Sequence, residues 1–355
     1  MSYSESMSPL PLSVLDLAMA TTADSTSSAL SNALKLATHA DELGFERFWV
    51  AEHHNMNTVA STNPAVLIAH LAAKTSRIRL GSGGVMLPNH APLVIAEQFA
   101  LLEALHPDRI DLGIGRAPGT DQHTAAALRR TPGNRDVQDF PNNLIDLMGF
   151  LGDVRTEKGT WDYLSATPMA TSYPDIYLLG SSNFSAELAG MLGLPFVFAN
   201  HFDTGGTLQA VEIYRGHFNP SIVLEEPFTI VTASVIISET RDQAEWESGP
   251  GRIRKYGMRT GKRAPLISPA DAAPHTDLAE AKAMPTNSII GTPVEVKSDL
   301  EELAKATQAS ELMISTSTFN VETRLKTLDL LSEVWKNDSI DSNDLNKRST
   351  QGTLA

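Results

Sequence analysis

Short apolar runs alternate with longer segments of helical periodicity along most of this 355-residue chain. The runs carry residue types typical of strands and occupy residues 12–19, 47–51, 78–81, 110–114, 176–179, 196–199, 228–237 and 312–315. Because strand–helix units build a parallel sheet, and eight of them close on themselves, we predict an α/β fold with a single (β/α)8 TIM barrel. A doubly wound open sheet is the alternative, but no GxGxxG motif follows the first strand to favour it.

The alternation is lost between residues 249 and 287. No Asp or Glu lies between Arg252 and Pro269, and the segment contains the basic residues Arg252, Arg254, Lys255, Arg259, Lys262 and Arg263. We expect residues 1–335 to form the barrel, 249–287 to be a long mobile loop inserted before the eighth strand, and 336–355 to be a polar C-terminal tail. The loop could bind a phosphorylated cosubstrate or a negatively charged partner, although a solvated mobile loop is the simpler interpretation.

The composition argues against several classes of protein. The chain has 42 acidic and 28 basic residues, and a net charge of -14 disfavours a nucleic-acid-binding surface. It has no cysteine, which excludes a thiolate metal site and a cysteine nucleophile. The N-terminal stretch lacks Lys, Arg and a long apolar core, and no apolar run has the length of a membrane span. We therefore expect a cytoplasmic protein that does not associate with a membrane.

Three titratable residues, Glu52, His53 and His54, stand directly after the predicted strand at residues 47–51. Active sites of barrels lie at the carboxyl ends of the strands. A carboxylate can orient a neighbouring imidazole and raise its pKa, which favours His53 and Glu52 as catalytic residues over histidines that only satisfy a carbonyl. Adjacent residues of an extended segment point to opposite sides, and no third ligand has a recognised spacing, so we expect no metal site.

The other strand ends carry mostly small, uncharged residues. Such residues let the backbone approach a flat ligand closely, so Ser82-Gly83-Gly84 fits either a platform beneath a planar ring or a simple tight turn. The residues predicted to bind a cofactor at this face are Ala18, Met19, Ala20, His54, Ser82, Gly83, Gly84, Val85, Gly115, Arg116, Gly180, Ser181 and Ser182.

Two of these strand ends have the character of a phosphate site. Arg116 supplies a charged fork, and Gly180-Ser181-Ser182 opens a helix whose N–H groups and dipole favour an anion. Ser181 or Ser182 could instead be an ordinary N-cap, and Arg116 a surface charge. The occurrence of both features at consecutive strand ends makes the two interpretations about equal.

The chain resembles the bacterial luciferase-like family of flavin-dependent monooxygenases, including its alkanal monooxygenases. The resemblance covers most of the chain and rests on the order and spacing of GFERFWVAEHH (44–54), RIRLGSGGVMLPNHAPLVIAEQFALLEALHPDRIDLGIGRAPG (77–119), LLGSSNFSAELAG (178–190) and IIGTPVEVKSDLEELAKATQASELMIS (289–315). It implies a (β/α)8 barrel that uses reduced flavin and O2, and often a homodimer. It also implies a mobile loop over the site at the position of residues 249–287.

The resemblance implies roles for individual residues. His53 matches the family histidine near the reacting edge of the flavin, and Gly83-Gly84 matches a segment that often holds a non-prolyl cis peptide bond beneath the ring. Arg116, Ser181, Ser182 and Ser185 match positions that hold the flavin phosphate. Light-emitting relatives carry a reactive cysteine where this chain has Gly115, so light emission is not expected.

The resulting prediction is a flavin-dependent monooxygenase that uses reduced FMN and O2 to oxidise a small organic substrate, aldehyde-like or ketone-like, through a C4a-peroxyflavin. A separate flavin reductase would deliver the reduced FMN, and His53 would transfer protons. Relatives that use F420 usually differ from the EHH motif, which favours FMN. The alternatives are a non-catalytic flavin-binding protein, an F420-dependent dehydrogenase on the same fold, and a metal-dependent hydrolase.

Overall fold

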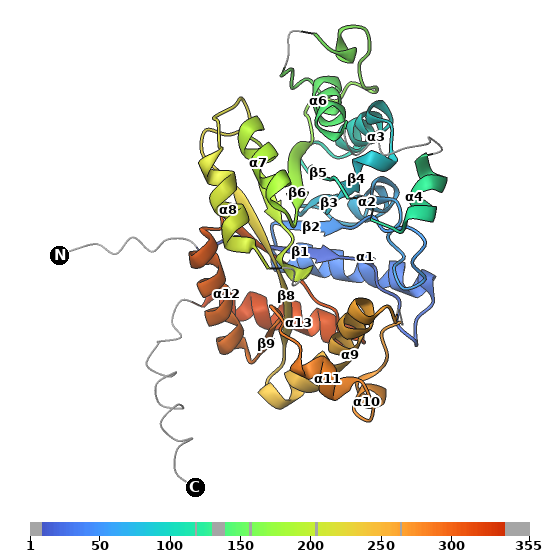
Figure 1. Ribbon diagram of the computed structural model, residues 1–355, viewed down its shortest axis with the longest axis vertical. Helices are drawn as coiled ribbons and strands as arrows, with labels where there is room; N and C mark the ends of the chain where they lie inside the picture. The colour runs from blue at the N-terminus through green and yellow to red at the C-terminus, as the bar shows by residue number, and fades with distance from the viewer. Residues whose placement is uncertain are drawn as a thin grey trace, which may run out of the picture.

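The computed structural model describes residues 9–117, 119–129, 139–155, 158–202, 205–262 and 265–337 (Figure 1). The strands are β1 (Leu12–Asp16), β2 (Arg47–Val50), β3 (Arg79–Ser82), β4 (Val85–Met86), β5 (Ile110–Gly115), β6 (Asp175–Gly180), β7 (Phe196–Phe198), β8 (Thr229–Ile237), β9 (Ile289–Gly291) and β10 (Glu311–Ser315). The helices are α1 (Thr26–Leu43), α2 (Pro64–Ala72), α3 (Pro92–Leu105), α4 (Gln122–Arg129), α6 (Phe140–Phe150), α7 (Asn183–Leu192), α8 (Thr207–Gly216), α9 (Arg241–Thr260), α10 (Pro269–Ala272), α11 (Leu278–Ala283), α12 (Pro293–Thr307) and α13 (Val321–Lys336), with short 3-10 turns η1 (Leu87–Asn89), η2 (Thr160–Asp162) and η3 (Asn200–Phe202).

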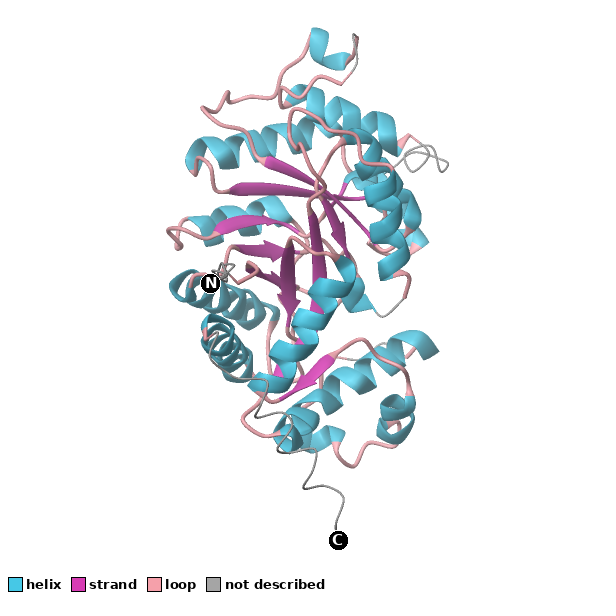
Figure 2. Ribbon diagram, turned by 90° about the vertical axis from the view of Figure 1, so that its left-hand side faces the viewer, coloured by secondary structure: helices cyan, strands magenta, loops and turns pink. Residues whose placement is uncertain are grey.

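Eight parallel strands close into a barrel, which confirms the predicted fold. The path runs β10-β1-β2-β3-β5-β6-β7-β8, and β10 pairs with β8 as well as with β1. Leu12 is in register with Leu312 on one side of the closure, and Ile230 is in register with Glu311 on the other. Helices surround the strands in Figure 2. Two short strands were not predicted: β4 pairs with β5, and β9 pairs with the end of β8.

Helix ends follow the local signals in the sequence. The helix α1 ends at Gly44, which adopts the left-handed conformation at φ 81°, as glycine does most readily. Asn63 caps α2 through its side chain, and Pro64 occupies the first turn of that helix. Thr292 and Glu295 form the predicted capping box of α12. None of the helices among the described residues is long and apolar enough to cross a membrane.

An apolar layer fills the middle of the barrel. It consists of inward-facing side chains from six strands: Leu15, Trp49, Tyr177, Val197, Ile230 and Met313. The rings of Trp49 and Tyr177 meet edge to face, with centroids 5.0 Å apart. Leu15, Val197 and Met313 also line the pocket above this layer. The apolar layer is therefore the floor of the candidate site.

A buried charge cluster lies on the other side of this apolar layer, toward the amino ends of the strands. Asp111 is fully buried, and its Oδ2 accepts hydrogen bonds from Arg47 Nη1 at 3.0 Å and Trp49 Nε1 at 2.8 Å. Its Oδ1 accepts from Arg79 Nε at 2.9 Å and Nη2 at 2.6 Å. Arg47 Nε also pairs with Glu311 at 3.0 Å. The cluster joins β2, β3, β5 and β10 across the barrel.

Gly113 in β5 marks the closest approach of two strands. A Cβ at this position would lie 2.0 Å from the carbonyl oxygen of Ser82, whose hydroxyl also bonds both backbone groups of Gly113. We expect Gly113→Ala to lower the free energy of unfolding by about 1–3 kcal/mol, because β3 and β5 must separate. Urea denaturation measures this change. Gly216→Ala is the control, since no atom lies within 4 Å of a Cβ added there. Equal stability of the two variants would contradict the prediction.

The prediction of a structureless loop at residues 249–287 is wrong for the described part of this segment. The helix α9 continues to Thr260, and α10 and α11 follow it (Figure 1). Gly249, Pro250 and Gly251 read as helix breakers, but all three lie inside α9. Packing of Ile253 against Ala272 and Ala281 overrides their low propensity. Mobility of the segment stays a prediction; Arg263 and residues 338–355 of the tail lie outside the described residues.

Candidate active site

A pocket of about 530 Å³ opens at the carboxyl ends of the barrel strands. We call it the main pocket. Its volume falls within the range of about 300–1,000 Å³ that is usual for small-molecule sites. The structure brings together nine of the predicted residues in its wall: His53, Gly83, Gly84, Gly115, Arg116, Gly180, Ser181, Ser182 and Ser185. No Asp or Glu is among the described residues that line it.

One end of the main pocket is suited to an anion. Ser182 occupies the N-cap position of α7, but its side chain makes no capping hydrogen bond, so the ordinary N-cap role is not filled. The first backbone N–H groups of α7 therefore remain available to a ligand. The Arg116 guanidinium lies over the ring of Phe184, a residue of α7, and the guanidinium carbon is 4.1 Å from the ring centre. Phosphate is the kind of group that such an end would hold.

Glycines form the wall between β3 and β5. The Gly83–Gly84 peptide bond is cis, as the resemblance implied. A Cβ on Gly84 would lie 2.7 Å from the Gly113 carbonyl oxygen, and one on Gly83 would lie 2.7 Å from Leu15 Cδ1. Side chains at these positions would push the wall apart, so the two glycines keep it flat and close to the barrel floor.

His53 lies between the main pocket and a smaller one beside it. Its backbone N–H donates to the Ser61 carbonyl oxygen at 3.1 Å, but its buried Nδ1 has no hydrogen-bond partner among the described residues. Burial lowers the pKa of His53 below its usual value, and the nearby positive charge of Arg254 lowers it further. The imidazole is therefore uncharged at neutral pH and can accept a proton.

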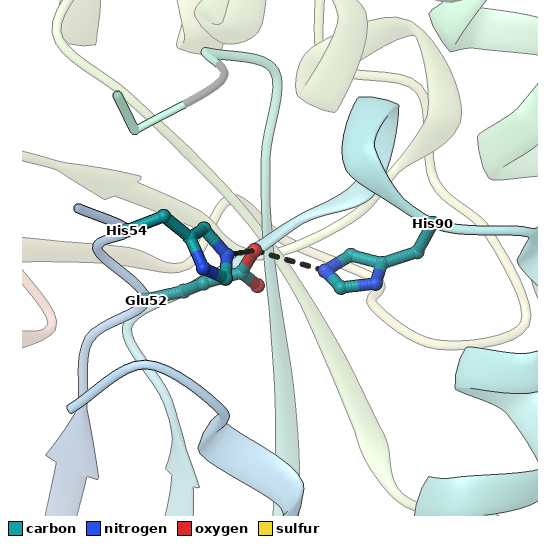
Figure 3. Close-up of side chains that lie close together, drawn as sticks. All are labelled: Glu52, His54 and His90. Carbon is teal, nitrogen blue, oxygen red and sulfur yellow. Dashed lines mark hydrogen bonds and ion pairs between the residues drawn. The ribbon is translucent and has the colours of Figure 1, made fainter. Parts of the chain in front are cut away.

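Glu52 and His54 do not line the main pocket. The Glu52 Oε1 accepts hydrogen bonds from His54 Nε2 at 2.8 Å and His90 Nε2 at 2.9 Å (Figure 3). Its Oε2 accepts a hydrogen bond from the Met86 N–H at 3.0 Å. Burial by itself would raise the pKa of Glu52, but these hydrogen bonds outweigh it and lower that pKa. Glu52 thus orients His54 and His90 rather than His53, and the expected rise in the pKa of His53 does not occur. A direct catalytic role for Glu52 stays a prediction.

The ligand atoms of Glu52, His54 and His90 lie within 4.8 Å of one another, a spacing that a metal ion could bridge. The ionised carboxylate accepts hydrogen bonds only, so both imidazoles carry a proton on the nitrogen that faces it. A metal would require those two protons to leave. His90 thus supplies the third possible ligand that the sequence spacing did not reveal, so the absence of a metal site stays a prediction. Metal analysis of the purified protein tests the hydrolase alternative.

Five predicted cofactor residues other than His54 do not line the main pocket. Met19 lines the smaller pocket instead. Ala18 and Ala20, the sequence neighbours of Met19, are buried. The Ser82 hydroxyl donates to the Gly113 carbonyl oxygen of β5, and Val85 pairs with Ile114 of the same strand. Sequence analysis did not assign a role to His201 and Thr232, which both line the main pocket. The His201 Nδ1 lies 2.6 Å from Thr232 Oγ1. The position of His201 after the strand at residues 196–199 does place it at this face of the barrel, whereas Thr232 inside β8 gave no signal.

The smaller pocket, which we call the side pocket, has a volume of about 160 Å³. It shares His53, His201 and Phe202 with the main pocket, so the two adjoin. Its wall contains both apolar and basic side chains. The remaining lining residues are Leu17, Met19, Met56, Val59, Ser234, Arg254, Lys255, Met258, Arg259, Ser315 and Ser317.

Known proteins share this sequence and fold. The chain is 43% identical over 333 residues to the uncharacterized protein YvbT of Bacillus subtilis, which covers 92% of this chain and 97% of YvbT. It is 39% identical to a luciferase-like monooxygenase of Escherichia coli and 34% identical to the N-acetyl-S-alkylcysteine monooxygenase of Bacillus subtilis, each over more than nine-tenths of both chains. The solved structure of apo-MsnO8 superposes with a TM-score of 0.82 at 34% identity, covering 92% of this chain and 98% of that one.

More distant structures share the fold alone. The oxygenating constituent of 3,6-diketocamphane monooxygenase in complex with FMN has a TM-score of 0.66 at 18% identity, covering 92% of this chain and 98% of that one. An F420-dependent secondary alcohol dehydrogenase has a TM-score of 0.65 at 16% identity, covering 94% of this chain and all of that one. The family model of the luciferase-like monooxygenases matches residues 10–310. The chain therefore belongs to the luciferase-like monooxygenase family and is an oxidoreductase that incorporates oxygen into its substrate.

Proposed function

We propose that the protein is an FMN-dependent monooxygenase that uses reduced FMN and O2 to oxidise a small organic substrate. The observation that supports this proposal is the lining of the main pocket, which includes Arg116, Ser182 at the start of α7, and His53, whose buried Nδ1 has no hydrogen-bond partner among the described residues. A phosphorylated flavin matches these groups. FMN and F420 occur in distant relatives of this fold, and the EHH motif favours FMN.

Residues in different parts of the main pocket would have different roles. Arg116 and Ser181, Ser182 and Ser185 would hold the phosphate, and the flat wall at Gly83-Gly84 would support the ring. Bound reduced FMN would supply the electrons that activate O2. His53 would accept or return a proton at the reacting edge, and the α9 segment would keep water out.

A flavin titration tests this proposal. Reduced FMN, oxidised FMN and F420 are each added without oxygen to the purified protein, and oxygen is then admitted while flavin absorbance is followed. We expect tight binding of reduced FMN and substrate-dependent use of oxygen. Selective binding of F420 would assign the protein to the dehydrogenases. If no flavin binds, the phosphate assignment and the proposed function are both wrong.

Removing the guanidinium of Arg116 tests the phosphate end directly. We expect Arg116→Ala to raise the dissociation constant of FMN about 10- to 100-fold, because a hydrogen bond to a charged group contributes roughly 1.5–3 kcal/mol. Fluorescence titration with FMN measures the change. Riboflavin, which lacks the phosphate, should bind both proteins equally. Arg241→Ala is the control, since Arg241 is exposed and pairs with Glu295 away from the pocket.

The substrate, reductase and oligomer belong to the same proposal. Aldehydes and ketones are candidate substrates, and N-acetyl-S-alkylcysteines are worth testing because a 34% identical relative carries them in its name. A separate reductase would supply reduced FMN. A homodimer would cover the exposed side chains of α2 and α3, among them Val66, Val94 and Leu101. Light scattering that gives the mass of one chain would contradict the dimer.

A further inference from the structure

The walls of the main and side pockets carry a positive charge that the rest of the chain does not share. The chain has 42 acidic residues against 28 basic ones. Among the described residues, however, no Asp or Glu lines either pocket, whereas Arg116, Arg254, Lys255 and Arg259 do. Arg116 is assigned to the phosphate, and the other three cations line the adjoining side pocket. A phosphate at Arg116 does not explain them.

These three cations come from one face of α9. Arg254 and Met258 are four residues apart, as are Lys255 and Arg259, and such pairs lie on the same side of a helix. All four line the side pocket. Met19, Met56 and Val59, which come from other segments of the chain, add apolar side chains to the lining of this pocket. The side pocket therefore combines an apolar surface with a cationic one, which suits an elongated molecule with one charged end.

Arg254 is partly buried and, unlike the arginines of the buried charge cluster, has no carboxylate partner among the described residues. Arg47 pairs with Asp111 and Glu311, and Arg79 pairs with Asp111 and Asp175. No ion pair or hydrogen bond of Arg254 is formed with the described residues, and burial lowers the pKa of its guanidinium with no carboxylate to offset the effect. Lys255, by contrast, donates to Ser288 Oγ at 2.8 Å. A partly buried guanidinium without a partner is a binding site for an anion.

We propose that the substrate is an organic acid whose carboxylate binds Arg254 in the side pocket. This inference rests on the proposed function and specifies its substrate class. The apolar part of the substrate lies along Met19, Met56 and Val59, and its reacting atom reaches His53, which the two pockets share. The carboxylate thus fixes the direction in which the substrate enters the main pocket.

A comparison of hexanoate with hexanamide tests the effect of the negative charge, because the two ligands have nearly the same size and differ by one charge. Calorimetric titration of the full chain, with and without FMN, gives both dissociation constants. We expect hexanoate to bind about 10- to 100-fold tighter than hexanamide, and we expect Arg254→Met to abolish the preference. Arg254→Lys should keep part of it. Arg241→Met, an exposed arginine of the same helix, is the control and should keep all of it.

Three results would overturn this inference. The first is that the unaltered protein binds hexanoate and hexanamide equally, or binds neither. The second is that Arg254→Met still prefers hexanoate. The third is that Arg254→Met loses affinity for FMN but keeps its affinity for hexanoate. The last result would mean that Arg254 holds the cofactor. The comparison of probes on the unaltered protein needs no variant to fold. Absence of FMN binding with the hexanoate preference intact would overturn the proposed function but leave the anion site.

Discussion

Replacing His53 with alanine is expected to lower kcat by about 100- to 10,000-fold, the usual contribution of a general acid or base. His53 is the group with an unpartnered ring nitrogen, the buried Nδ1, in the wall that both pockets share. Its side chain makes no hydrogen bond to the described residues, so its removal should leave the fold and the binding of FMN nearly unchanged. Turnover with reduced FMN, O2 and whichever of the candidate aldehydes, ketones or N-acetyl-S-alkylcysteines is oxidised measures the effect.

His217→Ala is the matched control, because the His217 side chain is about half exposed, follows α8 and lines neither pocket. It should retain full activity. If His53→Ala binds FMN and turns over at the rate of the unaltered protein, His53 has no part in the chemistry. If neither protein consumes oxygen with any substrate while both bind FMN, the non-catalytic flavin-binding alternative gains support.

The pH dependence of kcat/KM checks the same residue. Burial and Arg254 lower the pKa of His53 from its usual value near 6.5. If the uncharged imidazole is the active form, the acid limb of the profile should lie below about pH 6.5 and move upward in Arg254→Met. The lowered pKa also affects stability. The unfolded chain binds the His53 proton more readily than the folded chain does, so the free energy of unfolding decreases as the pH falls below about 6.5. An acid limb at or above pH 7 would contradict the assignment.

Asp111→Ala is expected to lower the free energy of unfolding by about 3–5 kcal/mol, the usual result of removing one partner from a buried ion pair. The carboxylate accepts hydrogen bonds from Arg47, Trp49 and Arg79, and no water reaches it at 0% exposure. Its removal leaves two guanidinium groups with fewer partners inside the barrel. Denaturation by urea measures the change.

Asp329→Ala controls for the loss of a surface carboxylate. Asp329 is half exposed and pairs with His39 at 2.7 Å, a kind of contact that contributes about 0–1 kcal/mol. If Asp111→Ala unfolds at the same urea concentration as Asp329→Ala, the buried cluster does not stabilise the barrel. Replacement of Asp111, Arg47, Arg79 and Glu311 together by apolar residues should cost less than Asp111→Ala alone, because it leaves no unpaired charge of the cluster inside the barrel.

The barrel could be predicted from sequence because its signals are local. Strand runs, Gly44 after α1 and the Thr292–Glu295 capping box each reflect contacts within a few residues. The three-residue strand β9 could not be found, because it forms only through its pairing with the end of β8. The helix α9 was missed for a related reason: its stability comes from α10 and α11, which pack against a stretch that contains Pro250.

The same difference between local signals and distant contacts decides which residues of the candidate site could be predicted. Residues that follow a strand directly, such as His53, Gly115 and Ser181, could be placed in the pocket wall from strand positions alone. The partner of Glu52 could not, because His90 lies 38 residues away and meets it only through the turn η1. Thr232 lies inside a strand, where only the direction of its side chain, and not its type, distinguishes a pocket residue from a core residue.

The short pairing of β8 with β9 has a consequence for how specificity can be exchanged. Val235, Ile236 and Ile237 are in register with Ile289, Ile290 and Gly291, so the segment from Ser238 to Ser288 leaves and re-enters the sheet at neighbouring points. That segment supplies the cationic wall of the side pocket, whereas Arg116 and the glycine wall come from the barrel. Because this segment starts and ends at the β8–β9 pairing, we expect that it can be exchanged between homologous barrels without replacing Arg116 or the glycine wall. Arg254 in this segment also lowers the pKa of His53, so such an exchange would alter the protonation of the site together with its cationic wall.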